Sequence, residues 1–146
     1  MKKKKIVVLL GGVSAEKNVS LKTGKYVSKS LKKQGYQVKE IKVTSNKNNL
    51  IKSLKEFEPD FVFNALHGYF GEDGKVQKIL DKLKLKYSHS NSKSSEIAMD
   101  KKKTKLIFNK IGVPYPKDIL VNSNSFNKKL RKLKFKYPLV IKPVNE

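Results

Sequence analysis

Residues 61–77 read FVFNALHGYFGEDGKVQ, an apolar run that passes directly into a loop with three glycines, one histidine and two carboxylates. The run follows Pro59 and Asp60 and has the length and composition of a buried strand. Glycines in the loop allow positive φ angles and a close approach of the backbone to a ligand. Ligands bind beyond the carboxyl ends of strands in open α/β sheets, so this loop is the first candidate site.

The residues on either side of this stretch alternate between strand and helix patterns. We expect strands at 6–10, 37–43 and 86–88 and helices at 20–34, 50–57 and 75–84, the last carrying Val76, Ile79, Leu80 and Leu83 on one face. Such alternation predicts an α/β fold with a parallel, Rossmann-like sheet and right-handed crossovers. The polar segment 90–95 is the best linker candidate, so a first domain is predicted at 1–91.

A second, smaller unit is expected at 92–146. Asp100 is a good N-cap for a helix that carries Leu106, Ile107 and Ile111 and ends at Gly112. Beyond it we expect a strand at 118–121, a basic amphipathic helix at 124–133 and a strand at 137–143. These elements have little core of their own, so this domain is predicted to be incomplete.

The net charge of +22 raises the possibility of a nucleic-acid-binding surface. Against it, the lysines are spread along the whole chain and Arg131 is the single arginine, although arginine is favoured for reading bases and for bidentate phosphate contacts. Solvated lysine-rich faces are therefore the preferred interpretation. We therefore expect no nucleic-acid partner. The chain has no cysteine, and its first apolar run is too short for a signal peptide or a membrane helix. These two features predict a cytoplasmic protein with no membrane partner.

Further candidate residues follow the first and last predicted strands. The loop 11–16 begins with two glycines at the end of a strand, which is typical of anion-binding loops, but it lacks the G-x-G-x-x-G spacing of dinucleotide sites. Lys142 lies in the apolar run 139–144, where burial would be costly without an anionic partner. Lys101, in contrast, stands in a run of three lysines and would be ordinary surface charge if judged alone.

Four motifs occur together in this order: GGVSAE with VSL at 11–21, HGYFGEDGKVQ at 67–77, MDK at 99–101 and PLVIKP at 138–143. Together they closely resemble the D-alanine-D-alanine ligases, which are ATP-grasp enzymes that make a dipeptide for peptidoglycan. The motif at 67–77 is highly specific for this family, and the others support it. The resemblance implies a pre-ATP-grasp domain at 1–91 and the start of a central ATP-grasp domain at 92–146.

The resemblance also implies roles for individual residues in an ATP-dependent ligation through an acyl phosphate. Glu16, Val19, Ser20 and His67 would bind the first D-alanine, with Glu16 and His67 also acting in catalysis. Glu72 and Asp73 would organise the loop. Lys101 and Lys142 would contact the phosphates of ATP, where a point charge offsets phosphate negativity.

Two departures from the family pattern and one gap qualify this interpretation. Lys78 stands where the family usually has a small residue, which requires its side chain to extend outward, and Ser88-His89-Ser90-Asn91 replaces a more usual Thr-Gly-Ser-Gly. The residues that would hold Mg²⁺ are expected beyond 146, so no metal ligand is assigned. We expect an N-terminal portion that does not turn over alone, from a ligase that is a homodimer when complete. A D-lactate or D-serine ligase and a basic nucleic-acid-binding module are the alternatives.

Overall fold

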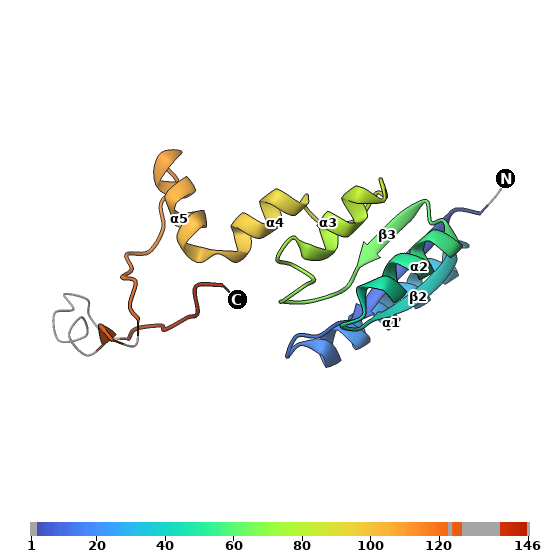
Figure 1. Cartoon of the computed structure of the whole chain (residues 1–146), viewed down its shortest axis with the longest axis horizontal. Coiled ribbons are helices and arrows are strands. Elements are labelled where there is room, and N and C mark those ends of the chain that lie inside the picture. The colour runs from blue at the N-terminus through green and yellow to red at the C-terminus, as the bar shows by residue number, and fades with distance from the viewer. Residues whose placement is uncertain (1–2, 123, 127–137, 146) are drawn as a thin grey trace.

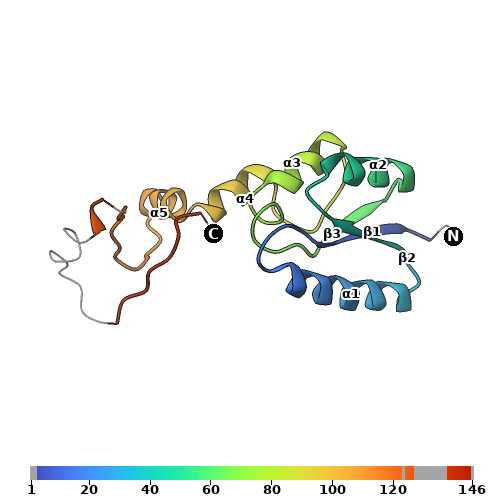
Figure 2. The same ribbon diagram turned by 60° about the horizontal axis from the view of Figure 1, so that its bottom comes forward.

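The computed structural model describes residues 3–122, 124–126 and 138–145. A parallel sheet of three strands in the order β2-β1-β3 lies at its centre, with β1 at Lys5–Gly11, β2 at Gln37–Val43 and β3 at Phe61–Asn64. Helix α1, at Lys17–Lys33, covers one face of the sheet, and α2 and α3 cover the other (Figure 2). The predicted α/β class with a parallel sheet is therefore confirmed.

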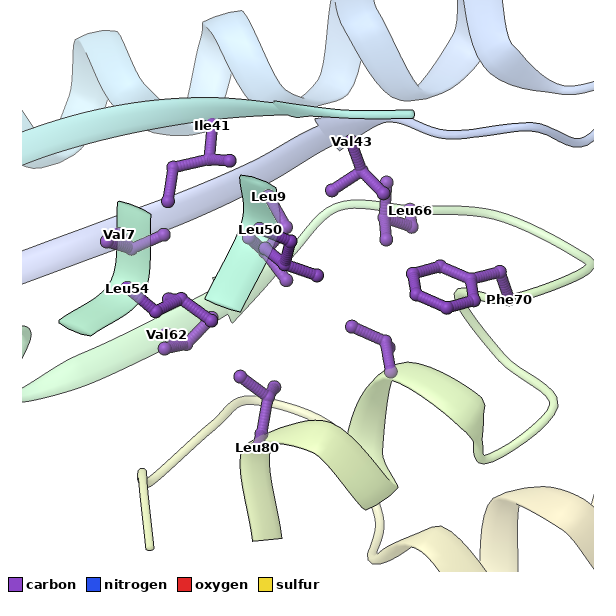
Figure 3. Close-up of a cluster of buried hydrophobic side chains, with 11 residues drawn as sticks. Val7, Leu9, Ile41, Val43, Leu50, Leu54, Val62, Leu66, Phe70 and Leu80 are labelled. Carbon is purple, nitrogen blue, oxygen red and sulfur yellow. The ribbon is translucent and has the colours of Figure 1, made fainter. Parts of the chain in front are cut away.

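The central position of β1 explains its composition. Both its edges are paired in parallel, with Ile6 opposite Val38 on one side and Phe61 on the other. A parallel strand covered on both faces has no solvent side, so it reads as a continuous apolar run. Side chains from all three strands, from α2 and α3 and from the loop after β3 form the main core (Figure 3), which consists of Val7, Leu9, Ile41, Val43, Leu50, Leu54, Val62, Leu66, Phe70, Val76 and Leu80.

Helix α1 packs on the opposite face of the sheet through a close approach to β1. A Cβ atom at Gly24 would lie 2.5 Å from Cβ of Leu10, so a larger residue would push the helix off the strand. Leu21, Val27 and Leu31, the face predicted for this helix, pack against the cluster of Val8, Leu10 and Ala65. The helix begins three residues earlier than predicted, and Gly35 follows its end with φ of +87°.

Helix α2 spans Lys47–Phe57. Helices α3 at Lys75–Lys82, α4 at Ser92–Met99 and α5 at Lys101–Lys110 follow one another away from the sheet (Figure 1). The short strand predicted at 86–88 is a single parallel bridge between Tyr87 and Val62. Asp100 caps α5 as predicted, since its carboxylate accepts hydrogen bonds from the amides of Lys102 and Lys103.

Four predictions for the second half differ from the structure in detail or fall outside the described residues. The segment predicted as a linker at 90–95 enters α4 at Ser92, because the side chain of Asn91 accepts a hydrogen bond from the amide of Ser94 and starts a helix. Residues 118–121 and 138–143 form no strand, because a strand needs a paired neighbour and no ladder forms beside these described residues. Most of the helix predicted at 124–133, and residue 137, lie outside the described residues.

Among the described residues, no helix combines the length and the apolar character needed to cross a bilayer.

Candidate functional site

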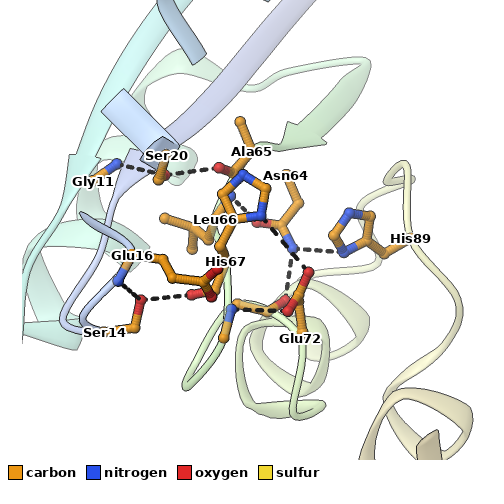
Figure 4. A network of polar contacts seen from close by, with 12 residues as sticks. Gly11, Ser14, Glu16, Ser20, Asn64, Ala65, Leu66, His67, Glu72 and His89 are labelled. Atoms are coloured by element: carbon orange, nitrogen blue, oxygen red, sulfur yellow. Dashed lines mark hydrogen bonds and ion pairs between the residues drawn. The ribbon is translucent and has the colours of Figure 1, made fainter. Parts of the chain in front are cut away.

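The carboxyl ends of β1 and β3 are neighbours because the two strands pair directly, so the loops that follow them meet (Figure 4). The hydroxyl of Ser14 in the first loop donates to the carbonyl oxygen of His67 in the second, at 2.7 Å. Ser20 makes a second connection: its hydroxyl accepts from the amide of Gly11 at 2.9 Å and donates to the carbonyl of Ala65 at 2.7 Å. Two serines thus hold together loops that are about fifty residues apart in sequence.

Ser20 is fully buried. Its hydroxyl therefore supports the two loops, and the D-alanine contact that the resemblance implied for it would require the loops to separate. The sequence pattern contains no signal of this burial, because serine at the start of a helix is usually exposed.

A Ser20→Ala variant should lose about 2–4 kcal/mol of unfolding free energy, because one buried donor and one buried acceptor are left without partners. The matched control is Ser28→Ala in the same helix. Ser28 is also buried, but its hydroxyl has no hydrogen-bond partner among the described residues, so its removal should be neutral or stabilising. Urea denaturation followed by circular dichroism measures both. Equal losses in the two variants would contradict the bridging role of Ser20.

The second loop is shaped by hydrogen bonds to Gly71. The carbonyl oxygen of Gly71 accepts from the side-chain amides of Asn64 and Gln77, each at 2.8 Å. Both amide residues are buried, and the side-chain oxygen Oδ1 of Asn64 also accepts from the backbone amide of Leu66 at 3.1 Å. No role was assigned to either residue from the sequence, although both lie in the stretch 61–77. A buried amide directly after an apolar run is the signal that could have identified Asn64.

The two carboxylates of the loop bond the loop's own backbone, which fits the organising role predicted for them. Glu72 accepts from the amide of Gly68 at 2.8 Å. Asp73 accepts from the amide of Lys75 at 3.1 Å and from its ammonium group at 2.7 Å. Burial alone would raise the pKa of Asp73, but the hydrogen bond from the Lys75 ammonium, together with backbone amides, holds that pKa below its ordinary value.

Lys75 is held from two sides. Its ammonium bonds Asp73 and lies 3.8 Å from the centre of the Tyr69 ring, close enough for a cation-π contact. The hydrogen bond to Asp73 is the main reason that the pKa of Lys75 is raised. Lys75 is thereby a fixed charge and not a freely moving surface lysine.

His67 and Glu16 have different surroundings in this arrangement. The Nδ1 atom of His67 lies 3.8 Å from a carboxylate oxygen of Glu72, whereas its Nε2 atom is buried and has no hydrogen-bond partner among the described residues. Glu16 is exposed, and its carboxylate lies beside Gly68, where an added Cβ would be 3.1 Å from Oε2. Because Gly68 has φ of +63° and no side chain, it leaves the space next to this carboxylate open.

A cleft of about 890 Å³ opens between the two loops and the start of α5. Glu16, Asp73, Glu96 and Asp100 line it, so four of the 12 acidic residues of a strongly basic chain gather here. Lys75, Lys78 and Lys103 also line it. A cleft with fixed charges of both signs suits a small zwitterion.

Of the predicted site residues, Glu16 and Asp73 line the cleft and the others do not. Val19 is half exposed on α1, and His67 is adjacent to the lining residue Gly68. Lys101 and Lys142 are not among the lining residues, although the amide of Lys101 donates to the carbonyl of Val144 at 2.9 Å. Their segments therefore meet at the rim.

The apolar run 139–144 predicted that Lys142 would be buried and would need an anionic partner. Lys142 is exposed in the structure, so its burial does not require such a partner. The apolar pattern at 139–141 was misleading because Val140 and Ile141 are themselves 79% and 74% exposed.

No group of three or more histidine, aspartate or glutamate side chains among the described residues is arranged to hold a metal ion. The described residues therefore do not fit a magnesium centre of their own.

Comparison with known proteins places this geometry in context. No protein-family model matches the chain. It is 47% identical over 146 residues to the D-alanine-D-alanine ligase of Pelagibacter ubique, covering 98% of this chain and 47% of that protein. The chain is therefore related to the D-alanine-D-alanine ligases. A second relative, D-alanine-D-alanine ligase B of Mesorhizobium japonicum, is 43% identical and is covered to 46% of its length.

Solved structures agree with the sequence relatives. The D-alanine-D-alanine ligase of Bacillus anthracis in complex with ATP has a TM-score of 0.71 and 39% identity, over 86% of this chain and 44% of that one. The chain thus spans about half the length of the ligases that it matches. The resemblance found in the sequence motifs is confirmed.

Proposed function

We propose that this chain carries the first-substrate site of an ATP-dependent ligase that joins two D-alanines for peptidoglycan synthesis. The observation that carries this proposal is the acid-rich cleft with Glu16 on its wall, next to the loop of His67, whose Nε2 is buried and unpartnered among the described residues. A buried ring nitrogen without a partner costs free energy unless a ligand satisfies it. The ligase relatives supply the reaction class.

In the proposed site, the ammonium group of the first D-alanine pairs with Glu16. The carboxylate of Glu16 lies at the N-terminus of α1 and beside the open space at Gly68, so an ammonium can reach it without displacing a side chain. Such a charge-assisted pair fixes the orientation of the substrate. His67, whose Nδ1 lies 3.8 Å from the carboxylate of Glu72 and which precedes the lining residue Gly68, is proposed to contact the bound molecule.

The chemistry then follows from the orientation of the substrate carboxylate. This carboxylate attacks the γ-phosphorus of ATP, forms an acyl phosphate and releases ADP. The amine of the second D-alanine attacks the acyl carbon and gives a tetrahedral intermediate, which expels phosphate as the peptide bond forms and the amine loses a proton. Lys101 and Lys142, whose segments meet at the rim of the cleft, are proposed to contact the phosphates of ATP.

The domain division and the cellular setting belong to the same proposal. We place the boundary between a substrate-binding domain at 1–91 and the start of the ATP-grasp domain at 92–146, supported by the start of α4 at Ser92. The complete ligase is proposed to be a cytoplasmic homodimer that requires Mg²⁺, which would supply positive charge to offset the negative charge of the phosphates. The described residues offer no ligand set for that ion, so no step is assigned to it.

The test is release of ADP from ATP in the presence of Mg²⁺ and D-alanine, measured with the product of the complete reading frame that contains this chain. We expect ADP release to depend on D-alanine and mass spectrometry to detect the dipeptide. Preferential use of D-serine or D-lactate as the second substrate would redirect the proposal to those ligases. ATP hydrolysis without D-alanine, or D-alanine with no dipeptide formed, would overturn it.

A further inference from the structure

Helix α4 is attached to its surroundings mainly by polar contacts. Ser95 is its one buried residue, and all eight of its residues are described. Its N-terminus lies directly against the loop, because a Cβ at Gly74 would clash with the carbonyl oxygen of Ser92. At its other end, the hydroxyl of Thr104 on α5 donates to the carbonyl of Ile97 at 2.8 Å. A helix with so little apolar contact depends on such contacts for its orientation.

Glu96 is the charged centre of this helix. One of its carboxylate oxygens accepts from the ammonium of Lys78 on α3 at 2.7 Å, and the other lies 4.0 Å from the ammonium of Lys103 on α5. The hydrogen bond from Lys78 is the main cause of a lowered pKa at Glu96. All three side chains line the cleft.

Lys78 connects α3 to α4 in this arrangement. It occupies a position where the family resemblance predicts a small residue, and its side chain extends outward from α3, as predicted, to reach α4. A small residue there could not make this contact. The pair is therefore a feature of this chain and not of the motif.

We propose that Glu96 is a positioning residue that fixes α4 between α3 and α5. The N-cap of α5 is the cleft residue Asp100, and Lys101 is the first residue of that helix, so the orientation of α4 sets where both lie relative to the loops. The importance of this placement for ATP rests on the proposed function; the positioning itself does not. An exposed ion pair contributes little to global stability, so its effect should appear in the position of α4 and not in the melting temperature.

Because the chain has no cysteine, two introduced cysteines give unique spin-label sites. We would replace Lys29 on α1 and Lys110 on α5, both exposed, and measure the distance distribution between the labels by double electron-electron resonance. In this background, Lys78→Glu and Glu96→Lys should each broaden or shift the distribution. The exchanged pair Lys78→Glu/Glu96→Lys, combined with Lys103→Gln so that the new ammonium faces no like charge, should restore the original distribution, with the melting temperature little changed throughout.

The matched control is Glu56→Lys on α2, which makes the same charge change at an exposed ion pair within one helix. It should leave the distribution unchanged. An unchanged distribution in Glu96→Lys, or a shift that the exchanged pair fails to restore, would overturn the positioning role. Failure of the D-alanine assay would overturn the proposed function instead, since the label distances involve no substrate.

Discussion

A Glu16→Gln variant should bind D-alanine roughly 10- to 100-fold more weakly than the unaltered chain. A hydrogen bond to a charged group contributes about 1.5–3 kcal/mol, and each 1.4 kcal/mol is a factor of ten in affinity. Glutamine keeps the size and shape of the side chain and removes its charge. Titration of the ¹⁵N-labelled chain with D-alanine, followed by chemical-shift changes in the loops 11–16 and 65–74, measures the affinity.

Two controls separate recognition of the ammonium from a general loss of structure. Propanoate lacks the ammonium group, so the Glu16→Gln variant should bind propanoate no more weakly than the unaltered chain does. Glu56→Gln removes the same charge from a residue on α2 that does not line the cleft, and it should leave D-alanine binding intact. If Glu16→Gln binds D-alanine as tightly as the unaltered chain does, the assignment of Glu16 to the substrate ammonium is wrong.

A Gly71→Ala variant should lose about 2–3 kcal/mol of unfolding free energy, the upper part of the range for overpacked cores. The new Cβ would lie 2.5 Å from Cβ and 2.9 Å from the carbonyl carbon of Leu66, and neither atom can move freely. Any shift of Gly71 also moves the carbonyl oxygen that satisfies the buried amides of Asn64 and Gln77. Urea denaturation measures the loss.

Gly35→Ala is the control that isolates the cost of the backbone. Gly35 has φ of +87°, but a Cβ there would meet nothing within 4 Å. Its replacement should cost about 1 kcal/mol, the strain of a left-handed conformation for a residue with a side chain. A loss in Gly71→Ala no larger than this value would show that the loop adapts and that packing against Leu66 is not limiting.

The sheet was predictable because its strands are local patterns of apolar residues. The strand Gln37–Val43 has the predicted bounds, and Phe61–Asn64 lies where the apolar run placed it. Helix starts were less accurate, since they depend on capping. Helix α2 starts three residues before the predicted position because the side chain of Asn46 accepts from the amides of Asn48 and Asn49. That residue was visible in the sequence.

The second half shows why pattern alone was insufficient. The apolar run at 139–141 has the composition of a strand, yet these described residues lie exposed and unpaired with any strand. Apolar composition predicts a strand only when another strand is available as a neighbour. The segment 90–95 has the polar composition of a linker, yet α4 begins within it at Ser92, because the capping side chain of Asn91 is enough to start a helix.

The candidate site was likewise predictable only in part. The motif at 67–77 identified the loop, and Glu16 does line the cleft beside it. Burial and pairing were not readable: Ser20 proved inaccessible, Lys142 proved exposed, and Glu96 carried no sequence signal. These properties depend on contacts between segments distant in sequence, and a linear pattern does not record such contacts.

The central place of β1 in the sheet has a consequence for how the chain folds during synthesis. β1 can pair with β2 once residue 43 has emerged, but its other edge has no neighbour until β3 at Phe61–Asn64 follows. In that interval an apolar strand edge is open to other nascent chains, and non-local parallel pairing is slow. Closure of that edge also brings the carbonyl of Ala65 to Ser20, so the two loops that hold the candidate site residues meet in the same step.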